Sequence, residues 1–102
     1  MSGVLKEIAA ERQRQIEAEG WTKEHDDEHG DGELSHAAVC YAYCAVTFGG
    51  LPDESFAQLP PPDAWPWAHE WWKPKNQRSA LVRAAALIAA DIERLDRKAS
   101  NA

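Results

Sequence analysis

The sequence lacks most of the features that mark membrane, secreted and redox proteins. Its 102 residues contain no apolar run long enough to span a bilayer, and the first residues turn charged at once instead of forming a signal segment. Only two cysteines are present, Cys40 and Cys44, four residues apart in an apolar stretch where a disulfide within one helix would be strained. We therefore expect a cytoplasmic protein with no membrane partner and two buried thiols.

The motifs of several enzyme classes are absent as well. The chain has no GxSxG, no GxxxxGK and no GxGxxG, so serine-nucleophile, P-loop and Rossmann chemistry are unsupported. Neither cysteine suits a nucleophile, because both stand in apolar company. The net charge is −6 and the isoelectric point is near 5.1. Nucleic-acid binding is not expected from such a chain, since phosphate affinity needs a basic face.

The fold class that the sequence predicts is all-α, in a single helical domain covering residues 1–102. Three main helices are expected, at about 4–19, 33–48 and 79–98. A loop rich in proline and tryptophan separates the second helix from the third, because its glycines and prolines rule out regular structure. A domain of this size has a modest core, so a homodimer or higher homo-oligomer is the expected way to bury more surface.

Each predicted helix carries a pattern of apolar residues. The first has a stripe of Val4, Leu5, Ile8, Ala9 and Ile16. The second is apolar on nearly every side, which predicts a central, buried helix. The third begins at a capping Ser79 and has a stripe at coiled-coil-like spacing, made of Leu81, Ala84, Ala85, Ile88, Ile92 and Leu95.

The charge excess of the chain is confined to one short segment. Residues Glu24–Glu33 contain six acids and no lysine or arginine, whereas the remaining residues are neutral in sum. A block of like charge either stays solvated or gathers around cations. Two interpretations follow: a metal or ligand site, and a solvated acidic loop that leads into a capped helix.

Possible metal ligands are close together in and beside this acidic segment. Carboxylate oxygens suit Mg²⁺ or Mn²⁺, and imidazoles widen the choice to zinc or iron. Glu33 and His36 are three residues apart on a predicted helix, so their side chains point the same way. The candidate ligands here are His25, Asp26, Asp27, His29, Glu33 and His36.

Two charged residues, Asp91 and Arg12, interrupt the apolar stripes of the third and first helices. An acid at the edge of an apolar stripe is costly unless it is paired or bound to a metal. Asp91 therefore either joins the metal ligands or forms a salt bridge with Arg12. A positioned Arg12 could also hold a phosphate group.

Four of the five tryptophans lie within residues 65–72, next to a basic C-terminal part. Residues 73–98 have a net charge of +4, whereas residues 1–72 have −10. Aromatic rings beside cations can stack a base and hold its phosphates. The candidates for this role are Trp71, Trp72, Lys73 and Lys75. The alternative is that the tryptophans build the core.

The order of several short motifs resembles a family of phage and prophage proteins named for the dATP/dGTP diphosphohydrolase N-terminal domain. The resemblance covers nearly the whole chain, and the combination is specific although no single motif is. The motifs are Glu11-Arg12-Gln13-Arg14-Gln15-Ile16, Glu19-Gly20-Trp21-Thr22, Glu24-His25-Asp26-Asp27, Gly32-Glu33-Leu34, Trp65-Pro66-Trp67, Trp72-Lys73-Pro74 and the helix from Leu81 to Arg97.

The resemblance implies a nucleotide-handling protein of the host-cell cytoplasm, related to the MazG-like nucleotide pyrophosphohydrolases. Its expected activity is metal-dependent hydrolysis of purine deoxynucleoside triphosphates, with Mg²⁺ or Mn²⁺ as cofactor. The alternative is a binder without turnover, a sponge that sequesters a host nucleotide signal. Those relatives bind Mg²⁺ through an ExxE pair and an ExxD pair on two helices, and this chain does not repeat that scheme.

Under the hydrolase prediction each candidate residue has a role. The predicted catalytic residues are His25, Asp27 and Glu33. The predicted metal ligands are Asp26, Asp27, His29, Glu33, His36 and Asp91. The predicted substrate contacts are Arg12, Lys73 and Lys75 to phosphate, with Trp71 or Trp72 stacking on the purine.

Overall fold

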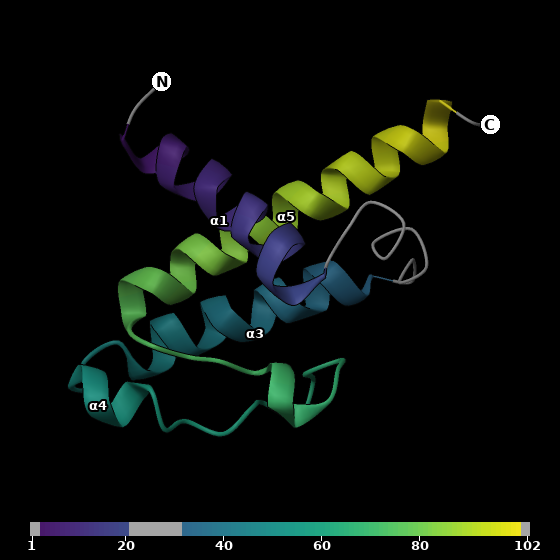
Figure 1. Cartoon of the computed structure of the whole chain (residues 1–102). Coiled ribbons are helices and arrows are strands. Elements are labelled where there is room, and N and C mark those ends of the chain that lie inside the picture. Colours follow the sequence, from purple (N-terminus) through teal and green to yellow (C-terminus); the bar gives the residue numbers. More distant parts are fainter. Residues whose placement is uncertain (1–2, 21–31, 101–102) are drawn as a thin grey trace.

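The computed structural model of this chain describes residues 3–20 and 32–100 and shows an all-α fold (Figure 1). Its elements are α1 (Gly3–Glu19), α3 (Glu33–Phe48), α4 (Asp53–Phe56), a 3-10 turn (His69–Trp71) and α5 (Gln77–Ser100). The three main helices are the predicted ones, with α5 longer at both ends. No strand occurs in the two described stretches, and no helix in them is long and apolar enough to cross a membrane.

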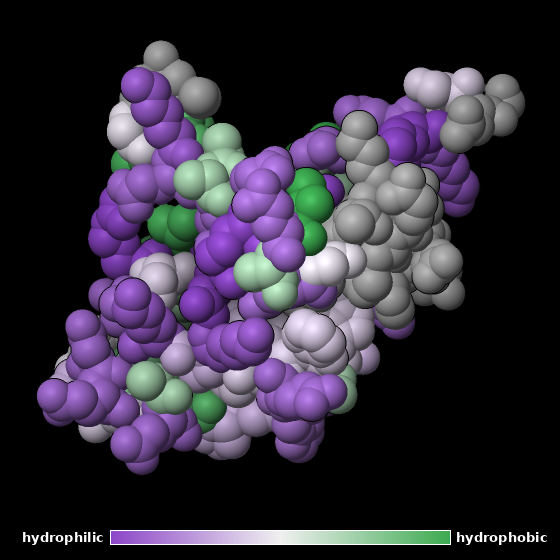
Figure 2. All heavy atoms as spheres, viewed as in Figure 1, coloured by the Kyte–Doolittle hydropathy of each residue, from purple (hydrophilic) through white to green (hydrophobic). Residues whose placement is uncertain are grey.

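The centre of the fold is an antiparallel pair of helices, α3 and α5. The side chain of Ser35, near the start of α3, donates a hydrogen bond to Asp91 in the second half of α5. At the other end, the Gln77 side chain at the start of α5 donates to the carbonyl of Ala45. Helix α1 crosses α5, and the connection between α3 and α5 runs along the opposite side of α3 (Figure 1). The first turns of α1 and the last turns of α5 extend away from this centre. Hydrophilic residues cover most of the face seen from this side, with separate apolar patches between them (Figure 2).

The core lies between α3, α5 and the aromatic part of the connection. Tyr41 stacks on Trp72 with ring centroids 4.6 Å apart, and the edge of Trp65 meets both rings. The indole nitrogen of Trp72 donates to the carbonyl of Leu59 at 2.8 Å, so its one polar atom is satisfied. Trp65 and Trp72 are therefore core residues, as the structural interpretation of the tryptophans predicts.

Most of the apolar stripe predicted for α5 is not on its buried face, and only Ala84 of its members is buried. Leu81, Ile88, Ile92 and Leu95 are each about half exposed, and the buried positions are held by Leu87 and several alanines. The prediction that α3 is buried on all sides is also wrong. Its exposed apolar side chains are Val39, Tyr43 and Val46. In both helices the sequence pattern predicts an apolar surface that packs against another part of a protein. The described residues cover only part of this apolar surface.

The fully buried side chains of helix α1 are polar: Arg12, Gln15 and Glu19. Its contacts with the rest of the fold include the ion pairs Glu7–Arg78, Arg12–Glu93 and Glu19–Lys73. The predicted apolar stripe is confirmed only in part. Its members Ile8 and Ile16 are half-buried beside Arg12, whereas Val4, Leu5 and Ala9 are exposed.

The two cysteines are free and buried in α3, as predicted. Burial raises the pKa of both thiols, and for Cys40 the nearby Cys44 adds to the effect. Because the thiolate is the reactive form, these residues act as small apolar side chains.

Candidate functional site

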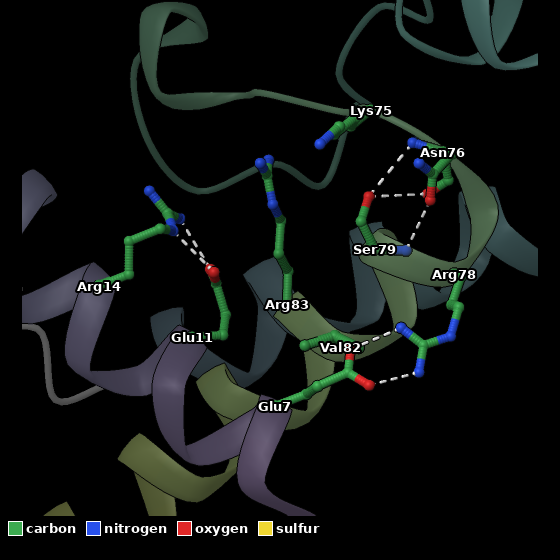
Figure 3. A pocket seen from close by; sticks show the side chains of 9 residues that line it. All are labelled: Glu7, Glu11, Arg14, Lys75, Asn76, Arg78, Ser79, Val82 and Arg83. Atoms are coloured by element: carbon green, nitrogen blue, oxygen red, sulfur yellow. Dashed lines mark hydrogen bonds and ion pairs between the residues drawn. The ribbon is translucent and has the colours of Figure 1, made fainter. Parts of the chain in front are cut away.

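A polar pocket of about 390 Å³ lies between α1 and the beginning of α5 (Figure 3). Its lining residues are Glu7, Glu11, Arg14, Lys75, Asn76, Arg78, Ser79, Val82 and Arg83. Four of these carry a positive charge and two carry a negative charge. The pocket is therefore a cationic site in a protein whose overall charge is −6.

The floor of the pocket is the N-terminus of the 24-residue helix α5. Asn76 Oδ1 accepts a hydrogen bond from the amide of Ser79 at 2.8 Å, and Ser79 Oγ accepts one from the amide of Asn76 at 3.2 Å. This reciprocal pair is a capping box, so Asn76 rather than the predicted Ser79 caps the helix. The positive end of the helix dipole adds to the cationic character of the pocket.

Two of the four cations are held in place by carboxylates. Arg78 makes two bonds of 2.6 and 2.7 Å to the carboxylate of Glu7, and Arg14 makes two bonds of 2.7 Å to Glu11 (Figure 3). Hydrogen bonding to Glu11 raises the pKa of Arg14, and the bond from Arg78 lowers the pKa of Glu7. These bidentate pairs fix the walls of the pocket.

The other two cations, Lys75 and Arg83, have no carboxylate partner among the described residues. The Arg83 guanidinium donates to the carbonyl of Lys73 and lies 5.8 Å from the ring centroid of Tyr41. The nitrogen ends of Arg14, Lys75 and Arg83 point toward the same space (Figure 3). Converging cations at a helix N-terminus, two of them without a carboxylate partner in the described part of the chain, form an arrangement that suits phosphate or carboxylate groups.

A segment without helix or strand, residues 72–76, leads from an aromatic ring to this pocket. Trp71 ends the 3-10 turn, and Trp72 after it is in an extended conformation. Trp72 is buried and Trp71 and Pro74 are half-buried, whereas Lys73 and Lys75 are exposed. The Lys73 ammonium lies 5.5 Å from the Trp71 ring centroid and 3.3 Å from the Glu19 carboxylate. One ring and two lysines therefore line the approach to the pocket.

The structure separates the predicted substrate contacts into three groups. Lys75 lines the pocket, and Lys73 and Trp71 stand on the segment that leads to it. Trp72 belongs to the core. Arg12 is 8% exposed on the face of α1 that meets α5, with Glu93 at 3.7 Å.

Of the four cations that line the pocket, the sequence predicts only Lys75 as a substrate contact and misses Arg14, Arg78 and Arg83. A signal for two of them was available: residues 73–83 contain four bases and no acid, the counterpart of the acidic segment. Arg14 gives no such signal, because it stands among glutamates on α1.

Only some of the predicted metal ligands lie among the residues that the structure describes. His25, Asp26, Asp27 and His29 lie outside the described residues. Those that are described share the end of the molecule where α3 begins. Glu33 accepts a hydrogen bond from the Trp67 indole at 3.3 Å, and His36 is exposed. In residues 3–20 and 32–100 no three acidic, histidine or cysteine side chains are placed to hold a metal ion.

The carboxylate of Asp91 already has two donors. Ser35 Oγ donates to one oxygen at 2.5 Å and Arg94 Nε to the other at 2.7 Å. Of the two predicted partners, Arg12 and a metal ion, neither is needed to satisfy these oxygens. The described residues alone therefore do not fit a metal centre at Asp91.

We expect the free energy of unfolding to depend on pH through the ionisation of Asp91. Burial raises its pKa, but the bonds from Ser35 and Arg94 and the charge of Arg94 together lower it below the ordinary value of 3.8. A lowered pKa stabilises the fold above the ordinary value, and this contribution is lost as pH falls through the folded value. Asp91→Asn should lower the free energy of unfolding by about 1.5–3 kcal/mol near neutral pH. The deficit should shrink as acid protonates the wild-type residue.

Urea unfolding of wild type, Asp91→Asn and the exposed control Asp96→Asn, from neutral to strongly acidic pH, measures this effect. A deficit for Asp91→Asn that is the same at every pH would contradict the assignment.

A scan against family models and searches of curated proteins and of solved structures find no match for this chain.

Proposed function

We propose that this protein binds a nucleotide, with the phosphate groups in the pocket at the start of α5. The observation that carries the proposal is the pair Lys75 and Arg83, two cations without carboxylate partners among the described residues, beside Arg14 and Arg78. Charge-assisted hydrogen bonds to phosphate oxygens are strong, and a guanidinium offers them in a planar fork. The N-terminus of α5 favours the same negative charge.

The segment before the pocket supports a nucleotide over a simple anion. Trp71 is half-buried with a small recess of about 210 Å³ between it, Glu70 and Lys73. A base stacked on Trp71 would place its phosphates along Lys73 toward Lys75. Base–aromatic stacking contributes about 1–3 kcal/mol. The resemblance described above makes purine deoxynucleoside triphosphates the first class to test.

Hydrolysis of the bound nucleotide is the second candidate function. It is supported by the position of Glu33, the last residue of the acidic segment, and His36 in the first turn of α3. Divalent metal ions neutralise phosphate charge and activate water in such reactions. The ligand set would have to include Asp26, Asp27 or His29, because the described residues do not form one by themselves.

Binding and hydrolysis are distinguished by one experiment. The protein is mixed with dATP or dGTP, with Mg²⁺ or Mn²⁺, and both released pyrophosphate and protein-bound nucleotide are measured. Pyrophosphate release that Asp27→Asn abolishes identifies an enzyme. Intact nucleotide recovered in stoichiometric amount after denaturation identifies a sponge. Neither binding nor turnover with either nucleotide would contradict the proposal.

A further inference from the structure

Helix α5 carries an apolar seam that the described residues leave open. Leu81, Ala85, Ile88, Ile92 and Leu95 follow one another at spacings of four, three, four and three residues. The four large side chains are 49, 47, 54 and 50% exposed in chain order. Alternating spacings of three and four keep a row of side chains on one line of a helix over several turns, and they are typical of a helix that packs against another helix.

A second apolar row on α3 lies beside this seam. Ser35, Val39 and Val46 share one line of α3, and Val39 and Val46 are 60 and 83% exposed. Ser35 touches Asp91, whose neighbours one turn away on α5 are Ile88 and Leu95. The exposed rows of the two antiparallel helices therefore adjoin, and we call this surface the α3–α5 face. Its α5 row alone is about 21 Å long.

The longest stretch outside the described residues does not have a composition that suits this face. Residues 21–31, outside the described ones, contain five acids and one large apolar side chain, Trp21. Exposed apolar surface on two adjacent helices is costly in water and marks an interaction site. A seam with this spacing is typical of a helix that packs against another helix with a similar seam.

We propose that a second copy of this chain covers the α3–α5 face, so that α3 and α5 of two copies form a four-helix bundle. An isologous dimer brings the same face from both copies, and each supplies the seam that the other needs. Apolar side chains stand at all five seam positions, with no charge to be buried without a partner. Val82 and Arg83, which line the pocket, are not on the seam, and Arg78, which also lines it, stands three residues before Leu81, beyond the first seam residue.

The mass in solution tests this proposal, measured by sedimentation and light scattering. The wild type should have the mass of two chains. Ile88→Lys/Ile92→Lys and, from the other helix, Val46→Lys should have the mass of one chain at the same concentration. The matched control Ala18→Lys, at an exposed position of α1, should stay dimeric.

Helix content by circular dichroism should be the same in all of these proteins, because each replaced side chain is already about half exposed or more. A wild type with the mass of one chain at every concentration would overturn the proposal. So would variants at both rows that keep the mass of two chains.

Discussion

Replacing both Lys75 and Arg83 with glutamine should weaken nucleotide binding about 100-fold, because each loses a charge-assisted contact of about 1.5 kcal/mol. The variant should still fold, since Lys75 is exposed and Arg83 loses only its bond to the Lys73 carbonyl and its position over the Tyr41 ring. Helix content by circular dichroism checks this. Isothermal titration with dATP, at low and at moderate salt, measures the loss. Affinity of the wild type should fall as salt rises, because the contacts are ionic.

A charge-matched control separates the pocket from the general charge of the protein. Lys6→Gln/Lys98→Gln removes the same two positive charges at exposed positions that do not line the pocket. This control should bind nearly as well as the wild type. Equal weakening in the two double variants would show that long-range charge, rather than the pocket, determines affinity, and would contradict the assignment.

Trp72→Ala should lower the free energy of unfolding by about 3–5 kcal/mol, the usual cost of deleting a large buried aromatic side chain. Trp72 is 8% exposed, stacks on Tyr41 and donates to the carbonyl of Leu59. Its removal leaves a cavity against Tyr41 and an unsatisfied carbonyl. Urea unfolding followed by circular dichroism measures the effect.

Trp71→Ala is the matched comparison, because it removes the same side chain one position earlier. Trp71 is only half-buried, so this variant should lose much less stability but should bind nucleotide more weakly. The opposite pattern, with a stable Trp72→Ala and an unstable Trp71→Ala that still binds, would reverse the roles assigned to the two rings.

The helices themselves could be predicted from the sequence because their signals are local. Gly20 has a positive φ of 71°, a conformation that favours glycine, directly after the last residue of α1. The prolines of the connection likewise exclude a long helix there. The start of α5 that the sequence predicts, at Ser79, is two residues late, because the reciprocal bonds between Asn76 and Ser79 that cap the helix at Asn76 are visible only in the structure.

The buried faces were harder to predict, because periodicity shows that a helix has an apolar side but not what covers it. On α5 the most regular apolar row is the exposed one, and burial falls on alanines and Leu87. A monomer core and an interface between copies give the same sequence pattern. The sequence predicts an oligomer, from size alone, but it does not indicate which surface would form one.

The candidate pocket combines residues that are distant in sequence. Arg78 binds the carboxylate of Glu7, which is 71 residues earlier in the sequence. Arg83, on α5, donates to the carbonyl of Lys73, ten residues earlier and before the helix begins. Lys73 and Lys75 were identified because they follow the tryptophans directly. Arg14 and Arg83 resemble ordinary solvated charges until α1 is packed against α5. The predicted metal site, which depends on residues 25–29, stays a prediction.

Titration of nitrogen-15-labelled protein with dATP, followed by magnetic resonance, tests nucleotide binding at the start of α5 most directly. The backbone amides of Lys75 through Arg83 and the indole of Trp71 should shift first and saturate together. The same signals should remain in place for Lys75→Gln/Arg83→Gln at the same nucleotide concentration. Shifts confined to other parts of the chain, or none at all, would contradict the proposed function.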